Sequence, residues 1–498
     1  MKVACLILLS IFIGFMELSL AKQDQATDVL SVPGIVINSL FADLNNDHVV
    51  EALVFFLDET SGEPSRRLAV FHCRQDHYEQ QPEQVLDIES SAVCYDLADL
   101  DGDGNQDLML LVGDGIIVHF FRSGVFGSNA TRIIKNATIF NIGLIDNLIH
   151  WDIVQRPDTM SRNSLLLIPT QAGFDLHKSI GTKWEFLQTI NHNHRCTVAG
   201  NASFDNDRPS FIRLNCILPS IVIADYNGDK HPDLFIIDSR MISIHECNFD
   251  GKFESQPTEV FGKNLLSFEE RHSGQAALGF EIHDLNNDGI ADIVVTKNTG
   301  DVTSYQTSIQ IYRGKTMGGY NSTPSDQFSV PNGASSPYIN DLNRDGRLDL
   351  ILPSLKLGFM STLKILLLKN VEVNLTVYLQ TATDQYTDKP DFEKSFAYNV
   401  AINQNVDYAG ILTLEGDYNG DGLKDLLIHE GDGVLKIFFG APGKIFESGA
   451  SWQTEIPRPD GLDSPDLNGD GGSEIVAHYI QQPDHRNSVR VIWPNLKK

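Results

Sequence analysis

One nine-residue arrangement of oxygen-bearing side chains recurs seven times along the chain. Asp stands at position 1, Asp or Asn at position 3, Asp at position 5 and Asp or Glu at position 9, and an apolar run follows. Ca²⁺ takes about six to eight oxygen ligands in a flexible shell, so side chains at this spacing, with a backbone carbonyl near position 7, can wrap a tight turn around one ion. We therefore predict about seven structural Ca²⁺ sites. The predicted ligands are Asp43, Asn45, Asp47, Glu51, Asp99, Asp101, Asp103, Asp107, Asp225, Asn227, Asp229, Asp233, Asp284, Asn286, Asp288, Asp292, Asp341, Asn343, Asp345, Asp349, Asp417, Asn419, Asp421, Asp425, Asp466, Asn468, Asp470 and Glu474.

A bound ion also accounts for the small residues and the charge of these loops. Positions 4 and 6 are repeatedly Gly or Asn, as in Asn287 and Gly289, and these residues tolerate the positive φ that a tight turn demands. The loops hold 22 of the 66 acidic residues, and seven divalent ions would move the formal net charge from −28 to −14. The acidity argues against nucleic acid and anionic membranes as partners.

Other acidic loops fit the sequence less well. An EF-hand needs a Glu at position 12 between two helices, whereas here position 12 is apolar, as at Leu110, Ile236 and Val295. Calcium β-rolls repeat every nine residues, and this chain has a far longer period. Acidic turns that are merely solvated remain the open alternative.

The spacing of the loops predicts the architecture. Their starts are separated by 56, 126, 59, 57, 76 and 49 residues, so the double-length gap indicates one unit that has lost its loop, around residues 150–154 and 165–169. Short β-rich runs precede and follow each loop, as at residues 221–224 and 234–237. We predict an all-β, seven- or eight-bladed β-propeller with calcium loops between the first two strands of most blades. Residues 29–36 are expected to complete the last blade and close the ring.

The N-terminus has the features of a secretory signal. Lys2 precedes an apolar run over residues 3–16, and Ser19-Leu20-Ala21 offers a small-x-small cleavage site. We predict a signal peptide over residues 1–21, a propeller over residues 22–498, and a secreted, periplasmic or cell-surface location; an uncleaved anchor is the alternative. No later run reaches the ~20 apolar residues of a membrane span, so no transmembrane segment is expected.

Cysteines are few in the predicted mature chain. Five remain after residue 21, which leaves at least one without a partner in this chain. Cys73 with Cys94, and Cys196 with Cys216, are candidate disulfides that sequence alone does not decide.

The loops, their place between two strands and their period resemble the FG-GAP/VCBS repeats of integrin α N-terminal propellers. Phe439-Gly440-Ala441-Pro442 matches the element that names the family, with partial echoes at Phe126-Gly127 and Phe261-Gly262. The first and last loops depart from the family pattern, with His48 at position 6 of the first and Glu51 and Glu474 at position 9.

The resemblance implies structural calcium on one face and ligands held by other loops. It favours a non-catalytic binding or adhesion module for a carbohydrate or an extracellular protein. An extracellular polysaccharide-active enzyme of the lyase or dehydratase type is the alternative, and a purely structural surface protein is a third reading. No catalytic residue and no organic cofactor is predicted, and the oligomeric state stays open.

Overall fold

The computed structural model describes most of the chain, and the predicted signal peptide lies outside it. The described residues are 26–60, 62–140, 148–155, 164–180, 183–201, 211–273, 275–300, 306–331, 333–335, 337–356, 370–399, 412–430 and 433–496.

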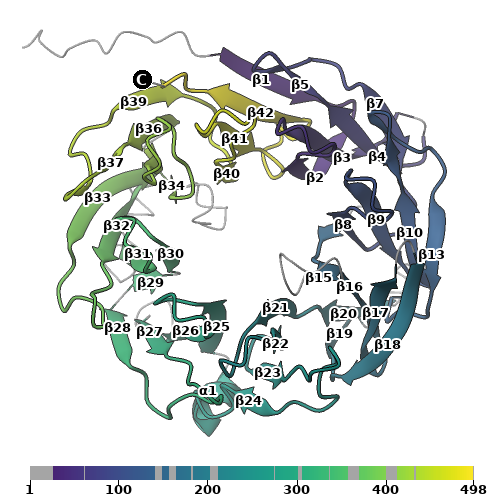
Figure 1. Ribbon diagram of the computed structural model, residues 1–498. Helices are drawn as coiled ribbons and strands as arrows, with labels where there is room; N and C mark the ends of the chain where they lie inside the picture. Colours follow the sequence, from purple (N-terminus) through teal and green to yellow (C-terminus); the bar gives the residue numbers. More distant parts are fainter. Residues whose placement is uncertain are drawn as a thin grey trace, which may run out of the picture.

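Eight antiparallel blades surround a central axis, and the first strand of each blade lies nearest that axis (Figure 1). The fold is therefore an all-β, eight-bladed β-propeller. Blades 1 to 4 consist of β2 (Ile35–Ala42), β3 (Glu51–Asp58), β4 (Ser65–Phe71) and β7 (Gln84–Asp87); β8 (Cys94–Ala98), β9 (Asp107–Val112), β10 (Gly115–His119) and β13 (Thr131–Lys135); β15 (Val154–Gln155), β16 (Leu165–Thr170), β17 (Gly173–Ile180) and β18 (Lys183–Asn191); and β21 (Ser220–Ala224), β22 (Asp233–Ile237), β23 (Ile242–His245) and β24 (Glu259–Phe261).

Blades 5 to 8 repeat this order. They consist of β25 (Ala276–His283), β26 (Asp292–Thr299), β27 (Gln306–Tyr312) and β28 (Asp326–Pro331); β29 (Gly333–Ser335) and β30 (Tyr338–Asn340), β31 (Asp349–Lys356), β32 (Asn370–Tyr378) and β33 (Phe392–Asn399); β34 (Leu412–Thr413), β35 (Leu426–Glu430), β36 (Val434–Phe438) and β39 (Trp452–Glu455); and β40 (Gly461–Asp463), β41 (Ile475–His478), β42 (Ser488–Trp493) and β1 (Ala26–Ser31).

The remaining elements are short strands and one helix outside the four-stranded pattern of the blades. They are β5 (Cys73–Arg74) with β6 (His77–Tyr78), β11 (Phe121–Arg122) with β12 (Val125–Phe126), β14 (Ile149–His150), β19 (Arg195–Asn201) with β20 (Phe211–Ile217), β37 (Gly440–Ala441) with β38 (Ile445–Phe446), and α1 (Phe268–Ser273). Among the described residues, no helix is long and apolar enough to cross a bilayer.

The hydrophobic core is divided among the junctions between blades. Eight buried clusters occur, one at each junction between neighbours. Between blades 1 and 2, for example, Phe55 and Leu68 pack with Tyr95 and Leu110. Second strands such as β3 and β9 are buried along their whole length and read as nearly continuous apolar runs, whereas outermost strands such as β1 and β13 keep exposed positions.

The core explains the state of the cysteines. Cys73 lies in the cluster between blades 8 and 1 and Cys94 in the cluster between blades 2 and 3. Both thiols are free, so the predicted candidate bridge between them is wrong. Cys196 lies opposite Cys216 in the β19–β20 register, but their side chains fall outside the described part, and this bridge stays a prediction.

The N-terminal strand closes the ring, as predicted, although its bounds differ. β1 pairs antiparallel with β42 from Ala26↔Trp493 to Ser31↔Ser488. The predicted segment, residues 29–36, instead spans the end of β1 and the start of β2. Pro33 interrupts it because proline lacks an N–H to donate, and Gly34 follows where a Cβ would lie 1.8 Å from the Leu57 carbonyl oxygen.

We expect Leu30→Ala to destabilise the ring by about 2–5 kcal/mol, because the Leu30 side chain is fully buried in the closing strand. Val29→Ala in the same strand is the matched control: Val29 is 38% exposed, and we expect a cost below about 1 kcal/mol. Urea denaturation measures both, and equal losses would contradict a closing role for the buried face of β1.

Candidate metal centre

The nine-residue loops lie where the sequence predicts. Each connects the inner strand of a blade to the second strand, in every blade except blade 3. Blade 3 is the predicted unit without a loop, and it is confirmed as a four-stranded blade of its own. All seven loops therefore lie on the same face of the propeller.

Two hydrogen bonds recur in all seven loops. The carboxylate at position 1 accepts the backbone N–H of position 6 at 2.5 to 3.0 Å. The carboxylate at position 5 accepts the N–H of position 7 at 2.8 to 3.0 Å. These bonds curl the chain around its acidic side chains, and carboxylate lone pairs remain for a cation.

The predicted backbone conformation is confirmed. Positions 4 and 6 have positive φ in every loop, including the non-glycine residues His48, Lys230 and Arg344. Positive φ is uncommon for such side chains, so the loop geometry is held even where the sequence does not favour it.

The carboxylate at position 9 is buried in all seven loops. One of its oxygens accepts the N–H of position 2 in every loop, at 2.7 to 3.2 Å. In five loops the other oxygen accepts an N–H from the chain that follows the third strand, donated by Phe121, Cys247, Gly314, Gln380 or Gly440. Position 9 thus links the two ends of its own loop and, in those five loops, also links the loop to the chain beyond the third strand.

Burial opposes the ionisation of five of these carboxyl groups. It raises the pKa of Asp107, Asp233 and Asp349 to about 6 each, and the neighbouring loop carboxylates add to the rise. By the same causes the pKa of Asp425 rises to about 7 and that of Glu474 to about 8. A divalent cation beside them would favour the ionised form.

The second loop gathers its carboxylates most closely. Asp99, Asp101 and Asp107 each offer an oxygen within 4.8 Å of the others, and Asp103 stands outside this group. Arg122 Nη2 lies 2.5 Å from Asp101 Oδ2 and supplies part of the balancing positive charge.

The first and fourth loops have protein cations near position 9. His72 Nδ1 lies 3.3 Å from Glu51 Oε1, and Arg313 Nη1 lies 2.8 Å from Asp292 Oδ2. Arg313 therefore partly compensates the charge of Asp292, and His72 does the same for Glu51 when its imidazole is protonated. A bound cation would then have less charge to neutralise there.

The loops also bond to one another around the ring. In five of them the N–H of position 8 donates to a carbonyl at position 1 or 2 of the preceding loop, at 2.7 to 2.9 Å. The donors are Val50, Gln106, Ala291, Leu348 and Ser473. In the third loop position 8 is Pro232, which has no N–H, and the sequence of the preceding blade 3 lacks the nine-residue acidic pattern.

The structure reveals what Gly440 of the name-giving element does. Its N–H donates to Asp425 at 2.7 Å, and a Cβ there would lie 2.7 Å from both Leu423 Cβ and the Lys424 carbonyl oxygen. Gly314 has the same role toward Asp292 in the fourth loop, which sequence reasoning missed. In the second loop Phe121 donates this bond, so the echo at Phe126-Gly127 is not equivalent to Gly440.

A comparison with known protein families identifies the repeats. Residues 225–295 and 284–352 match the family model described as FG-GAP-like repeat. Similar solved structures include an Agrocybe aegerita lectin that recognises non-reducing terminal N-acetylglucosamine (14% identity, 95% of this chain, 100% of that chain, TM-score 0.38). Others are the Vanderwaltozyma polyspora Nup133 β-propeller domain (13%, 84%, 98%, 0.38) and the Dos1 propeller (8%, 95%, 97%, 0.43). No curated protein matches the sequence. These structural likenesses concern the fold alone.

We expect Gly440→Ala to destabilise the protein by about 1–3 kcal/mol. The added methyl group would overlap the backbone and displace the residue-440 N–H that donates to the Asp425 carboxylate. Gly449→Ala is the control, since a Cβ at Gly449 meets no atom within 4 Å. Thermal and urea unfolding of both variants provide the measurement; a neutral Gly440→Ala would contradict the role given to this glycine.

The raised pKa values predict an unusual pH dependence for the ion-free protein. The folded state holds protons on Asp107, Asp233, Asp349, Asp425 and Glu474 that the unfolded chain releases above its ordinary pKa values of 3.8 and 4.5. The unfolding free energy therefore falls as pH rises from about 4 to about 8, by at most about 1.4 kcal/mol per pH unit for each group. Urea titrations after dialysis against chelator test this, with calcium-loaded protein as the control. Rising stability of the ion-free protein over this window would refute the assignment.

Proposed function

Since the chain carries FG-GAP-like repeats in a β-propeller, we propose that its seven acidic loops each bind Ca²⁺ and that the calcium-stabilised ring is a non-catalytic module for binding an extracellular carbohydrate or protein. One observation carries the calcium assignment. Seven loops share the same hydrogen bonds and backbone angles, and each places a buried carboxylate beside two or three partly exposed oxygen-bearing side chains. Buried charges of one sign are costly unless they are paired or coordinate a metal.

Calcium suits this donor set better than other common ions. All the side-chain donors are oxygen atoms, which hard cations prefer, and the loop is irregular enough for a shell of variable geometry. In the first loop, for example, Asp43 and Asp47 provide carboxylates and Asn45 an amide oxygen. The buried carboxylate of Glu51 completes the set.

Bound calcium would stabilise contacts between blades as well as within them. The carbonyl acceptors of the inter-loop bonds, such as those of Leu44 and Asp225, belong to the loops themselves. An ion that fixes a loop therefore also fixes the acceptor for the following blade. In this proposal calcium is a component of the scaffold rather than the site of ligand recognition.

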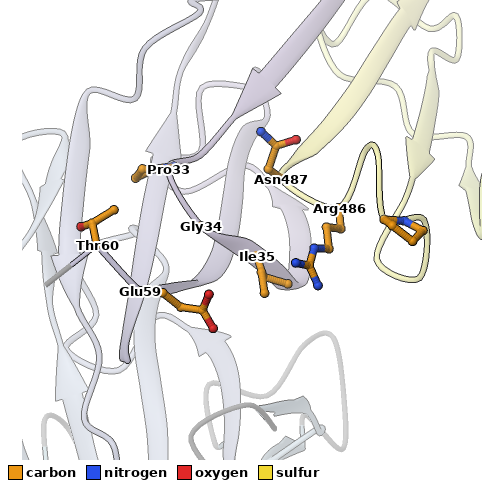
Figure 2. Close-up of a pocket in the computed structure, with 8 residues that line it drawn as sticks. Pro33, Gly34, Ile35, Glu59, Thr60, Arg486 and Asn487 are labelled. Carbon is orange, nitrogen blue, oxygen red and sulfur yellow. The ribbon is translucent and has the colours of Figure 1, made fainter. Parts of the chain in front are cut away.

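Two of the polar depressions on the described part of the chain suit a binding role. A groove of about 870 Å³ between blades 1 and 2 is lined by charges of both signs, including Arg67, Asp87 and Arg132. A second depression, of about 360 Å³, lies where the ring closes (Figure 2) and is lined by Glu59 and Arg486 among others. Residues Glu59 and Thr60 follow the far end of β3 from the first loop, so this depression lies opposite the acidic loops. Mixed charges and amide groups suit a polar ligand such as a carbohydrate or a hydrophilic protein surface.

We expect removal of calcium to lower the melting temperature substantially, because ions that bind only the folded state stabilise it by linkage. At a free Ca²⁺ concentration about 100 times the dissociation constant, each site contributes about 2.7 kcal/mol. Melting curves in chelator, in Ca²⁺ and in Mg²⁺ of equal ionic strength measure this effect, and native mass spectrometry counts the ions. Melting curves that coincide in chelator and in Ca²⁺ would refute the calcium assignment. A glycan and protein binding screen with and without Ca²⁺ tests the binding role, and turnover of a polysaccharide would contradict the non-catalytic assignment.

A further inference from the structure

The inner edge of blade 2 carries a strand that the repeat pattern does not explain. β14 pairs in parallel with β8, Ile149↔Cys94 and His150↔Tyr95, and makes this blade a five-stranded sheet. Because β8 is the strand nearest the axis, β14 extends the sheet inward, toward the central opening. The chain then continues through Asp152 into β15, the first strand of blade 3.

Alternation along this segment directs two ligand-type side chains to one side. His150 and Asp152 are two residues apart in an extended chain, so they project from the same face. The residues beside them are anchored: Trp151 donates its backbone N–H to the Tyr95 carbonyl at 3.1 Å, and Ile153 is fully buried between blades 2 and 3. The anchors fix the direction in which His150 and Asp152 point.

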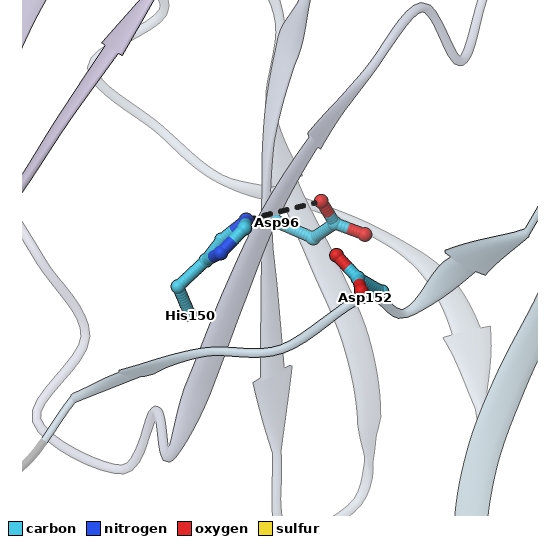
Figure 3. A group of neighbouring side chains, drawn as sticks. All are labelled: Asp96, His150 and Asp152. Atoms are coloured by element: carbon cyan, nitrogen blue, oxygen red, sulfur yellow. Dashed lines mark ion pairs between the residues drawn. The ribbon is translucent and has the colours of Figure 1, made fainter. Parts of the chain in front are cut away.

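The third member, Asp96, comes from β8 and is already oriented. Its Oδ1 accepts the N–H of Leu97 and its Oδ2 accepts the N–H of Val154, both at 2.8 Å. Asp96 is 7% exposed, whereas the His150 side chain is 40% exposed and Asp152 is exposed. Figure 3 shows the three side chains turned toward one another, and each offers one ligand atom within 4.8 Å of the other two.

The spacing fits a shared ion better than a direct hydrogen bond. His150 Nε2 lies 3.7 Å from Asp96 Oδ1, which is longer than the ordinary range of about 2.7–3.2 Å for such a bond. Two donors that each bind an ion at about 2.0–2.2 Å in tetrahedral geometry stand about 3.4 Å apart.

We propose that Asp96, His150 and Asp152 form a site for a divalent transition-metal ion of the zinc class, separate from the acidic loops. The imidazole nitrogen distinguishes it chemically, because nitrogen with carboxylate oxygens suits Zn²⁺ and related ions, whereas Ca²⁺ selects oxygen donors. Three protein ligands leave coordination positions open, and two of the ligands are exposed. The metal can therefore also hold water or an anionic oxygen of a ligand that enters the central opening.

The site is tested on tag-free protein, with Co²⁺ as a spectroscopic probe and Zn²⁺ as its competitor. Excess Ca²⁺ is present to keep Co²⁺ from binding to the acidic loops. We expect one equivalent of Co²⁺ with a visible absorption band that Zn²⁺ displaces and Ca²⁺ does not. His150→Ala and Asp152→Asn are each expected to weaken binding by more than about 100-fold, beyond the losses that changes around metal ligands usually cause.

His77→Ala is the matched control. His77 also lies beside one aspartate, with Nδ1 3.3 Å from Asp28 Oδ1, but His77 belongs to neither group of three candidate metal ligands found among the described residues. This variant should bind Co²⁺ as the wild type does. Asp152→Asn changes an exposed side chain, so circular dichroism should show an intact fold. Wild-type protein without saturable binding, Ca²⁺ that displaces the probe, or a His150→Ala or Asp152→Asn variant that binds Co²⁺ as tightly as the wild type would each overturn the proposal, whatever the outcome for the calcium loops.

Discussion

A buried carboxylate at position 9 is the interaction on which the blades depend. It lies at the start of the second strand of its blade or directly before it, accepts an N–H from the start of its own loop, and in five blades accepts another from beyond the third strand. Removing such a group from water is costly, and hydrogen bonds from fixed backbone donors return only part of that cost. The acidic side chains of the loop in front of it add electrostatic repulsion to this cost of burial. A bound cation would offset both the burial cost and the repulsion.

Contacts between neighbouring loops and blades extend the effect of each loop around the ring. Five of the loops accept a hydrogen bond from the loop that follows them around the ring, so the blades that carry them are joined by polar bonds at one end and by apolar clusters along their faces. Where the series of loops is interrupted at blade 3, the chain adapts on both sides. Pro232 removes the N–H that would lack a partner, and β14 widens the preceding blade toward the axis.

The repeated features could be predicted from the sequence because each lies within a short, fixed distance along the chain. The loop positions, their positive φ and the eight units all follow from spacings of nine residues and of one blade. The donors to position 9 could not be predicted, because they lie 14 to 31 residues further on, as the third strand and its turn vary in length. The cluster of Asp96 and His150 depends on the parallel pairing of β14 with β8, which the repeat pattern in the sequence does not predict. Cys73 and Cys94 seemed close in sequence, yet the blade architecture places them in different junctions.

Closure by β1 has a consequence for biosynthesis. Trp493 donates its indole N–H to Asp28, a residue made 465 positions earlier. While the ribosome is still adding blades, β1 has no partner, and the growing ring has an open edge at each end. Such edges are sites where a second nascent chain can add a strand. The ring therefore loses its open edges only when β42, the last of its strands along the chain, has been synthesised. Chains that terminate before β42 should depend on chaperones or be degraded.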